Sequence, residues 1–154
     1  MIDELDGDLL DSGAAALVNA VNCVGVMGKG IALEFKRRFP ANFAAYREAC
    51  AAGEVVPGRM LVCEDDGRVI VNFPTKKHWR AKSRLGDVEA GLDGLVCVIR
   101  ERGLDSVAVP ALGVGNGGLD WADVSRLVHE KLGGLPGVAV ELYRPLLRSI
   151  APGA

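Results

Sequence analysis

The sequence predicts an α/β protein in which helices cover a central, largely buried sheet. Short runs of apolar, often β-branched residues alternate along the chain with stretches whose apolar residues recur every three or four positions. A turn sequence between two of the apolar runs predicts a hairpin. Because a hairpin joins antiparallel strands, the sheet should be mixed and not wholly parallel.

The predicted strands are short and apolar. The continuous apolar run 15–21 predicts a strand buried on both faces. Met60–Cys63 and Val69–Phe73 lie on either side of Asp65-Asp66-Gly67, a sequence typical of a hairpin turn. The remaining strands are predicted over Ile2–Leu5, Val107–Val109 and Val138–Tyr143.

The first two helices are predicted from spacing and from their end signals. Ile31, Phe35 and Phe39 lie four residues apart, which places them on one helix face. Pro40 suits the first turn of a second helix, and Gly53 suits a position just past its last turn.

Two further helices are predicted in the second half of the chain. Val88 to Ile99 repeats its apolar residues every three or four positions. The last helix runs behind Asp120 as N-cap, with Asp123 at the capping-box position. Within it, Trp121 is predicted to join the core and His129 to lie on the surface.

Composition and charge exclude several classes of protein. The chain has 154 residues, a length that suits one domain with a full core. It contains 18 Lys and Arg against 20 Asp and Glu, which gives a net charge of -2. No apolar run approaches the roughly 18 residues needed to cross a bilayer. The first residues are acidic where a signal peptide would be basic. We therefore expect a cytoplasmic protein with no membrane segment.

The cysteines carry no metal-binding pattern. Cys23, Cys50, Cys63 and Cys97 show neither CxxC nor CxxH spacing. They are interpreted as buried, reduced thiols, and no metal or redox cofactor is expected.

Two glycine-rich segments each lie between a predicted strand and a predicted helix. The first glycine loop spans residues 25–30 and the second glycine loop spans residues 113–118. Glycine lets backbone N–H groups approach a ligand closely, and a helix N-terminus adds partial positive charge. Two such loops in one small domain suit a diphosphate held from both sides. A tight turn is an equally good interpretation of either loop alone.

Neither loop fits a common nucleotide motif. The second matches the GxGxxG pattern of dinucleotide-binding domains, but too little chain follows Gly118 for the rest of such a domain. Gly28-Lys29 resembles the end of a P-loop, yet Cys23 and Gly30 stand where that motif has Gly and Ser or Thr. An NAD dehydrogenase and a P-loop NTPase are not supported.

A basic strip between Gly67 and Gly86 indicates a polyanionic partner. This segment contains no Asp or Glu, although the chain as a whole is slightly acidic. His78 and Trp79 within it offer planar faces on which an unpaired base can stack. A solvated surface loop is the alternative interpretation. The basic residues of the strip are Arg68, Lys76, Lys77, Arg80, Lys82 and Arg84.

Four segments, in this order, resemble the macrodomain family. They are NAVN at 19–22, GVMGKGIA at 25–32, NFPTKKHWR at 72–80 and PALGVGNGGLDW at 110–121. The resemblance covers essentially the whole chain. It implies a single macrodomain over residues 1–154, with a three-layer α/β/α fold and a mixed central sheet. Segment 72–80 is similar to the macrodomains of the DarG antitoxins, which remove ADP-ribose from nucleobases of DNA.

The resemblance implies an ADP-ribose site. Asp8, followed by Leu9, matches the acid that in macrodomains hydrogen-bonds the adenine amino group, whereas the residue alone suggests a helix cap. Asn22 matches the amide that contacts the distal ribose, whereas the residue alone suggests a turn. The loops would hold the diphosphate through backbone amides. The residues expected to bind substrate are Asp8, Leu9, Asn22, Gly28, Lys29, Gly30, Ile31, Gly113, Val114, Gly115, Asn116 and Gly117.

Lys76 is the candidate catalytic residue. It follows an apolar strand at the carboxyl end, where ligands of open α/β sheets collect. In the branch that includes DarG, the matching Lys is proposed to attack the anomeric carbon of the distal ribose or to stabilise the leaving group. Attack requires a deprotonated amine. Protein-directed relatives carry an acid in the second glycine loop, and Asn116-Gly117-Gly118 has none.

We therefore expect a DNA ADP-ribosyl glycohydrolase that releases free ADP-ribose and acts as antitoxin to a DNA ADP-ribosyltransferase toxin. The expected partners are ADP-ribosylated, single-stranded DNA and the cognate DarT toxin, and the chain is expected to be a monomer. Two alternatives remain, a hydrolase of ADP-ribosyl esters on protein carboxylates and a non-catalytic ADP-ribose reader. The residues expected to contact DNA are Lys77, His78, Trp79, Arg80 and Lys82.

Overall fold

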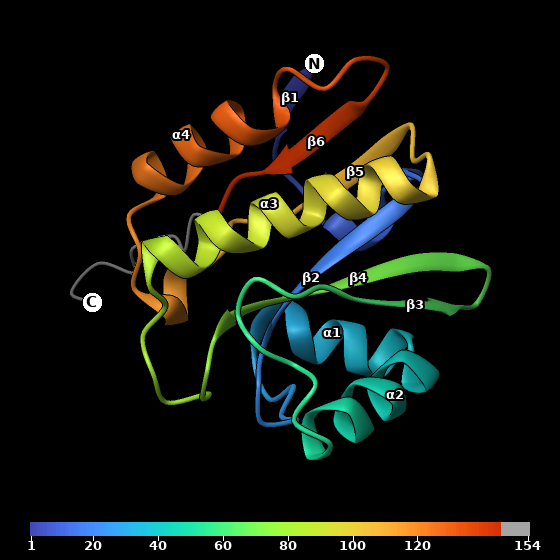
Figure 1. The fold of residues 1–154 in the computed structure, drawn as a ribbon, viewed down its shortest axis with the longest axis vertical. Helices are drawn as coiled ribbons and strands as arrows, with labels where there is room; N and C mark the ends of the chain where they lie inside the picture. The colour runs from blue at the N-terminus through green and yellow to red at the C-terminus, as the bar shows by residue number, and fades with distance from the viewer. Residues whose placement is uncertain (146–154) are drawn as a thin grey trace.

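The computed structural model describes residues 1–145 and confirms the predicted α/β architecture (Figure 1). One mixed sheet has the strand order β1-β6-β5-β2-β4-β3, in which β3 is antiparallel to β4 and the other neighbours are parallel. Its strands are β1 (Ile2–Leu5), β2 (Ala16–Asn22), β3 (Leu61–Asp65), β4 (Arg68–Lys76), β5 (Ser106–Val109) and β6 (Ala139–Tyr143).

Helices cover both faces of the sheet, so the fold has the three layers that the resemblance implies. The α-helices are α1 (Gly30–Arg38), α2 (Pro40–Ala51), α3 (Leu85–Arg102) and α4 (Trp121–Leu132), and the short 3-10 helices are η1 (Leu9–Asp11) and η2 (Gly115–Gly117). Figure 1 shows α3 and α4 together on one side of the sheet and α1 with α2 on the other.

The central strand β2 is apolar throughout because both of its faces are covered. Ala16 and Val18 belong to the core beneath α3 and α4, whereas Leu17 packs with Phe35 and Phe39 on the opposite face. A strand of this kind has no solvent side on which polar residues would alternate. This explains why the sequence shows a continuous apolar run there.

The hairpin between β3 and β4 is closed by the predicted turn. Asp66 and Gly67 have φ values of 52° and 71°, a pair of positive values that a two-residue hairpin turn favours. The β3–β4 ladder ends where Leu61 opposes Asn72, so Pro74 lies beyond it. Proline can therefore stand within β4 on the side where its missing N–H has no strand partner.

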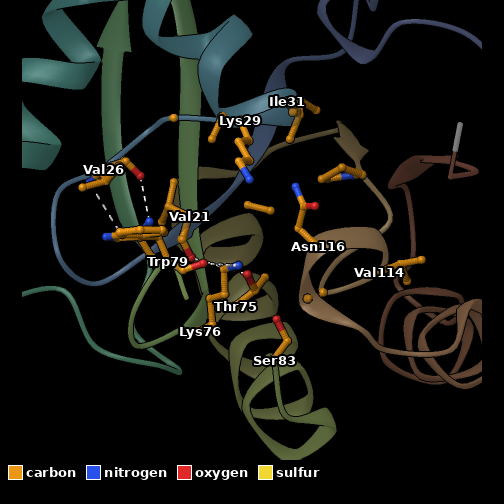
Figure 2. Close-up of a pocket in the computed structure, with 18 of the residues that line it drawn as sticks. Val21, Val26, Lys29, Ile31, Thr75, Lys76, Trp79, Ser83, Val114 and Asn116 are labelled. Carbon is orange, nitrogen blue, oxygen red and sulfur yellow. Dashed lines mark hydrogen bonds between the residues drawn. The ribbon is translucent and has the colours of Figure 1, made fainter. Parts of the chain in front are cut away.

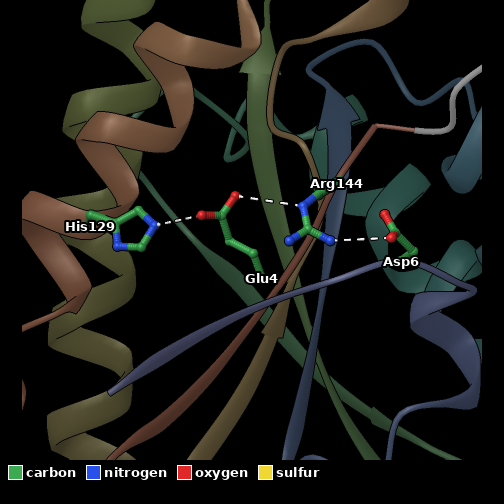
Figure 3. A network of polar contacts seen from close by, with 4 residues as sticks. All are labelled: Glu4, Asp6, His129 and Arg144. Carbon is green, nitrogen blue, oxygen red and sulfur yellow. Dashed lines mark hydrogen bonds and ion pairs between the residues drawn. The ribbon is translucent and has the colours of Figure 1, made fainter.

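The first strand forms one edge of the sheet. β1 pairs in parallel with β6, and a surface network joins their ends (Figure 3). His129, on the helix surface as predicted, lies 3.3 Å from Glu4, and Arg144 reaches Asp6 at 3.2 Å and Glu4 at 3.9 Å. Exposed ion pairs of this kind each contribute little to stability.

Two local predictions are corrected. Asp120 caps α4 by accepting the Ala122 N–H at 2.9 Å, but Asp123 pairs with Arg126 at 2.8 Å and does not complete a capping box. Cys97 is exposed, because it lies on the solvent face of α3 while Leu95 and Ile99 face the core. The other three cysteines are half-buried, and all four are free.

No helix within residues 1–145 is long and apolar enough to span a membrane. The same range contains no cluster of three or more His, Cys, Asp or Glu side chains that could hold a metal ion.

Candidate active site

The main cavity lies at the carboxyl ends of the parallel strands β2 and β5, which are neighbours in the sheet. The chain leaves β2 through α1 and α2 toward β4, and it leaves β5 through α4 toward β6 on the other side. Ligands of open α/β sheets bind where connections diverge in this way. The two glycine loops extend from these strands and line a cavity of about 620 Å³, a usual size for a small-molecule site.

Asn22 shapes the first glycine loop. Its Nδ2 donates to the Val26 carbonyl at 2.7 Å, and its Oδ1 accepts the Val24 N–H at 3.1 Å. The hydroxyl of Tyr46 lies 2.7 Å from the same Oδ1. Tyr46 is fully buried, which raises the pKa of its hydroxyl and keeps it protonated as a donor. Asn22 lines the cavity and also fixes the loop in place, and its contact to a ribose stays a prediction.

The N-terminus of α1 opens into the cavity. Lys29 is its N-cap and makes no side-chain capping bond. The N–H groups of Gly30, Ile31 and Ala32 lie in the first turn, where they have no intrahelical partner, and all three residues line the cavity. Gly30 has a φ of 57°, a conformation that favours glycine. This end of the cavity is suited to an anion.

The second glycine loop lines the opposite wall. Gly113, Val114, Asn116 and Gly117 face the cavity, whereas Gly115 lies between them without lining it. Residues 115–117 form η2, which has no side-chain cap. The N-terminus of α4 is capped by Asp120, and the N–H groups of Val114 and Gly118 donate to the Ala111 and Gly115 carbonyls. A ligand can therefore use only the other amides of the loop.

Lys76 ends β4 directly beside Asn22. Val21 pairs with Pro74, but Asn22 pairs with Lys76, so Thr75 is an extra residue that makes a bulge in β4. The Lys76 Nζ donates to the Trp79 carbonyl at 3.0 Å (Figure 2). The bulge therefore places a lysine amine at the point where β2 and β4 end.

The electrostatic surroundings of Lys76 favour its neutral form. Partial burial lowers the pKa of the amine, and the positive charge of Lys29 lowers it further. Among the described residues that line the cavity there is no Asp or Glu. No carboxylate of the cavity wall is therefore placed to hold Lys76 charged or to act as an acid or base.

The basic strip is exposed beside the cavity, with one exception, and Lys77, Lys82 and Arg84 line a second, smaller pocket. Lys77, His78, Trp79, Arg80 and Lys82 are all exposed, and Trp79 and Arg80 line the cavity. The imidazole of His78 stacks on Trp79 with ring centroids 5.4 Å apart, and the Arg80 guanidinium lies 4.5 Å from the Trp79 ring centroid.

Arg68 does not belong to this surface. It begins β4, whereas Lys76 ends it, and about 3.3 Å per residue separates the two along the strand. Its guanidinium donates to the Ser12 carbonyl at 2.7 Å and holds the segment before β2. Arg68 is close to the strip in sequence, but the extended strand carries it to the opposite end of the sheet.

Asp8 and Leu9 lie outside the cavity lining. The Oδ1 of Asp8 accepts the Leu10 N–H at 3.0 Å and caps η1, the role that the residue alone suggested. Leu9 is buried against the core formed with Phe35 and Phe39. Their contacts to an adenine ring stay a prediction.

Sequence reasoning missed Thr75 and Ser83, two buried hydroxyl residues that line the cavity. Ser83 is 7% exposed and stands between two exposed basic residues, so nothing in the sequence distinguishes it from a surface serine.

Comparison with known proteins identifies the family of the chain. The Macro domain family model matches residues 18–128, which include both glycine loops and Lys76. The chain belongs to the macro domain family. A DNA ADP-ribosyl glycohydrolase of Mycobacterium tuberculosis is 56% identical to this macrodomain over 149 residues, or 94% of this chain and 42% of that protein. The chain thus spans less than half the length of this curated relative.

Two solved structures extend the similarity to the fold. The macrodomain of Mycobacterium tuberculosis DarG matches this macrodomain with a TM-score of 0.92 and 55% identity, over 94% of this chain and 98% of that one. Thermosipho africanus DarTG, solved in complex with ADP-ribose, matches with a TM-score of 0.87 and 34% identity, over 98% of this chain and 43% of that one. The predicted resemblance to DarG macrodomains is confirmed.

Proposed function

We propose that this macrodomain is a DNA ADP-ribosyl glycohydrolase. It cleaves the N-glycosidic bond between a nucleobase and the distal ribose of ADP-ribose, and it releases free ADP-ribose and the restored base. The observation that carries the proposal is the half-buried amine of Lys76, which has a lowered pKa and lies in a cavity between two glycine loops. A reader that only binds ADP-ribose has no use for such an amine.

The two walls of the cavity suit the two ends of a diphosphate. The first turn of α1 supplies uncapped N–H groups on one side, and the amides of Gly113–Gly117 other than that of Val114 supply donors on the other. Fixed backbone donors need no reorganisation as negative charge binds. The distal ribose then lies beside Asn22 and Lys76, which are neighbours across the β2–β4 pair.

Lys76 acts on the anomeric carbon of the distal ribose. The Nζ lone pair forms a bond to this carbon while the bond from the carbon to the base breaks, and the base leaves with the bonding electron pair. The base takes up a proton to replace the one that Nζ gives to solvent. Water then attacks the same carbon, releases ADP-ribose and returns the amine. This sequence requires a neutral amine, which partial burial and Lys29 both favour.

The exposed part of the basic strip favours DNA over protein as the carrier of ADP-ribose. Arg80 brings a positive charge to a cavity that has no acid in its second loop, and Lys77 and Lys82 add two more on the exposed surface beside it. Positive groups around a site attract phosphates, and Trp79, 43% exposed, presents an aromatic ring to an unpaired base. We propose single-stranded DNA as the substrate for this reason.

The biological setting is proposed from the DarG and DarTG relatives. The macrodomain would act in the cytoplasm as a monomer and reverse the modification made by a DarT-type toxin.

The proposal is tested by incubating the protein with ADP-ribosylated single-stranded DNA and, in parallel, with ADP-ribosylated protein. We expect free ADP-ribose to appear from the DNA and not from the protein, and none from either in the Lys76→Ala variant. Release from protein esters alone would overturn the DNA assignment. Tight binding of ADP-ribose with no release from either substrate would identify a reader.

A further inference from the structure

Ser83 presents a buried hydroxyl that has no partner in the protein. The residue is 7% exposed, and no atom of residues 1–145 makes a hydrogen bond to its Oγ. Buried polar groups are nearly always hydrogen-bonded, so an exception requires an explanation. Ser83 lines the main cavity, and Figure 2 shows its hydroxyl on the side that faces Thr75 and the second glycine loop.

The structural role of Ser83 is carried by its backbone and not by its hydroxyl. Its N–H donates to the Gly117 carbonyl at 2.9 Å, which ties the second glycine loop to the segment before α3. An alanine would make this bond equally well. Thr75 differs, because its hydroxyl lies 3.4 Å from the Val21 carbonyl and has a partner within the sheet.

Glycine in the second loop makes room for this hydroxyl. A Cβ at Gly117 would lie 2.5 Å from the Ser83 Oγ, and a Cβ at Gly113 would lie 3.3 Å from it. The loop backbone therefore packs directly against the hydroxyl.

We propose that the Ser83 hydroxyl donates a hydrogen bond to a phosphate oxygen of the ligand, the phosphate that the second glycine loop holds. The inference rests on ADP-ribose as the ligand of the proposed function. An oxygen in this part of the cavity meets donors and no carboxylate, so the group that fits is an anionic acceptor. A hydrogen bond from a hydroxyl to a phosphate is charge-assisted and stronger than one between neutral groups.

The test compares Ser83→Ala with wild type by calorimetry, with ADP-ribose and ADP as separate ligands. ADP carries both phosphates and lacks the distal ribose. We expect Ser83→Ala to bind each ligand roughly 10-fold more weakly, since one charge-assisted hydrogen bond is removed from both complexes. Ser125→Ala, a hydroxyl deletion on α4 outside the cavity lining, is the matched control and should leave both affinities unchanged.

Thermal unfolding without ligand separates this role from a structural one. Because the hydroxyl has no partner in the protein, Ser83→Ala should unfold at the wild-type temperature or slightly above it. Unchanged affinity for ADP and ADP-ribose would overturn the inference, and weakened binding of ADP-ribose alone would transfer the contact to the distal ribose. Wild-type protein that binds both ligands but releases nothing from modified DNA would contradict the glycohydrolase and leave the Ser83 contact standing.

Discussion

The Nζ of Lys76 donates a hydrogen bond to the backbone carbonyl of Trp79, three residues further along the chain, at 3.0 Å. A lysine amine can donate this bond in its charged and in its neutral form, so the bond holds the side chain in either state. The acceptor belongs to the segment that carries the exposed basic residues. The position of the candidate nucleophile is thus linked to the surface that we propose for DNA.

Replacement of Lys76 separates nucleophilic attack from simple charge stabilisation. Lys76→Ala should retain ADP-ribose binding within a small factor and lose nearly all release from modified DNA, because the group acts chiefly in the transition state. Lys76→Arg keeps a positive charge but cannot supply a neutral nitrogen, so we expect it to be as inactive as Ala. Single-turnover release of ADP-ribose measures both variants. Substantial activity in Lys76→Arg would mean that the lysine works as a charge.

The pH dependence of release should move when Lys29 is neutralised. Activity rises with pH as Lys76 loses its proton, and the positive charge of Lys29 lowers the pKa at which this occurs. Lys29→Gln removes that charge and should shift the rising limb of kcat to higher pH. Measurement at saturating substrate keeps any loss of binding separate. Lys36→Gln, which removes the same charge further along α1, is the control. An equal shift in both variants would show that the charge of Lys29 has no specific effect on the pKa of Lys76.

The Tyr46 hydroxyl should matter for the ligand although it lies beneath the cavity. Tyr46→Phe removes the donor 2.7 Å from Asn22 Oδ1, which should lower the free energy of unfolding by about 1–2 kcal/mol. Since Asn22 holds the first glycine loop, ADP-ribose affinity should fall as well. Tyr143→Phe removes a hydroxyl that donates to Glu141 on β6 and should leave the affinity unchanged. Calorimetry and urea unfolding report the two quantities, and wild-type affinity in Tyr46→Phe would show that the loop keeps its shape without this bond.

Removal of positive charge from the exposed surface beside the cavity should weaken DNA binding and its dependence on salt. Changing Lys77, Arg80 and Lys82 together to Ala should flatten the log–log salt dependence by roughly 0.7 for each single-strand phosphate that the protein no longer neutralises. Affinity for free ADP-ribose should change much less. The matched control removes three bases on α3 and α4, namely Arg100, Arg102 and Arg126. If both triple variants respond alike across a salt series, Lys77, Arg80 and Lys82 have no special part in DNA binding.

The close approach of Gly117 to Ser83 should appear as a coupling between two substitutions. Gly117→Ala forces a Cβ to within 2.5 Å of the Ser83 Oγ, so it should destabilise the fold by about 1–3 kcal/mol. Adding Ser83→Gly removes the crowded atoms and should recover part of this loss, as urea unfolding of the four proteins would show. A double variant no more stable than Gly117→Ala alone would place the strain elsewhere.

The sequence predicted the order and type of the elements because the two periodicities differ. The four-residue spacing of Ile31, Phe35 and Phe39 suits one face of a helix, whereas the short, continuous apolar run of β2 suits a strand that is buried on both faces. The hairpin was predictable because Asp66 and Gly67 tolerate positive φ. Strand order and the separation of Arg68 from Lys76 depend on tertiary pairing, which no local pattern records.

The site was predictable to a similar degree. Asn22, Lys76 and residues of both loops line one cavity, because the motifs at the ends of β2, β4 and β5 meet at one edge of the sheet. Ser83 was missed because burial of a hydroxyl depends on packing and leaves no trace in a residue type. The cap at Asp8 was suggested by the residue itself, and its link to a nucleotide came from the family alone.

The extra residue Thr75 means that the location of the lysine amine is set by a count of residues as much as by their identity. Deleting Thr75 would restore an unbroken ladder in which the lysine follows Pro74 directly and still pairs with Asn22. The bend of the strand would be lost, however, and with it the hydroxyl that Thr75 adds to the cavity lining, so the lysine would approach the cavity from a straight strand end. In relatives and in engineered versions, the length of this strand is therefore as informative as the lysine itself.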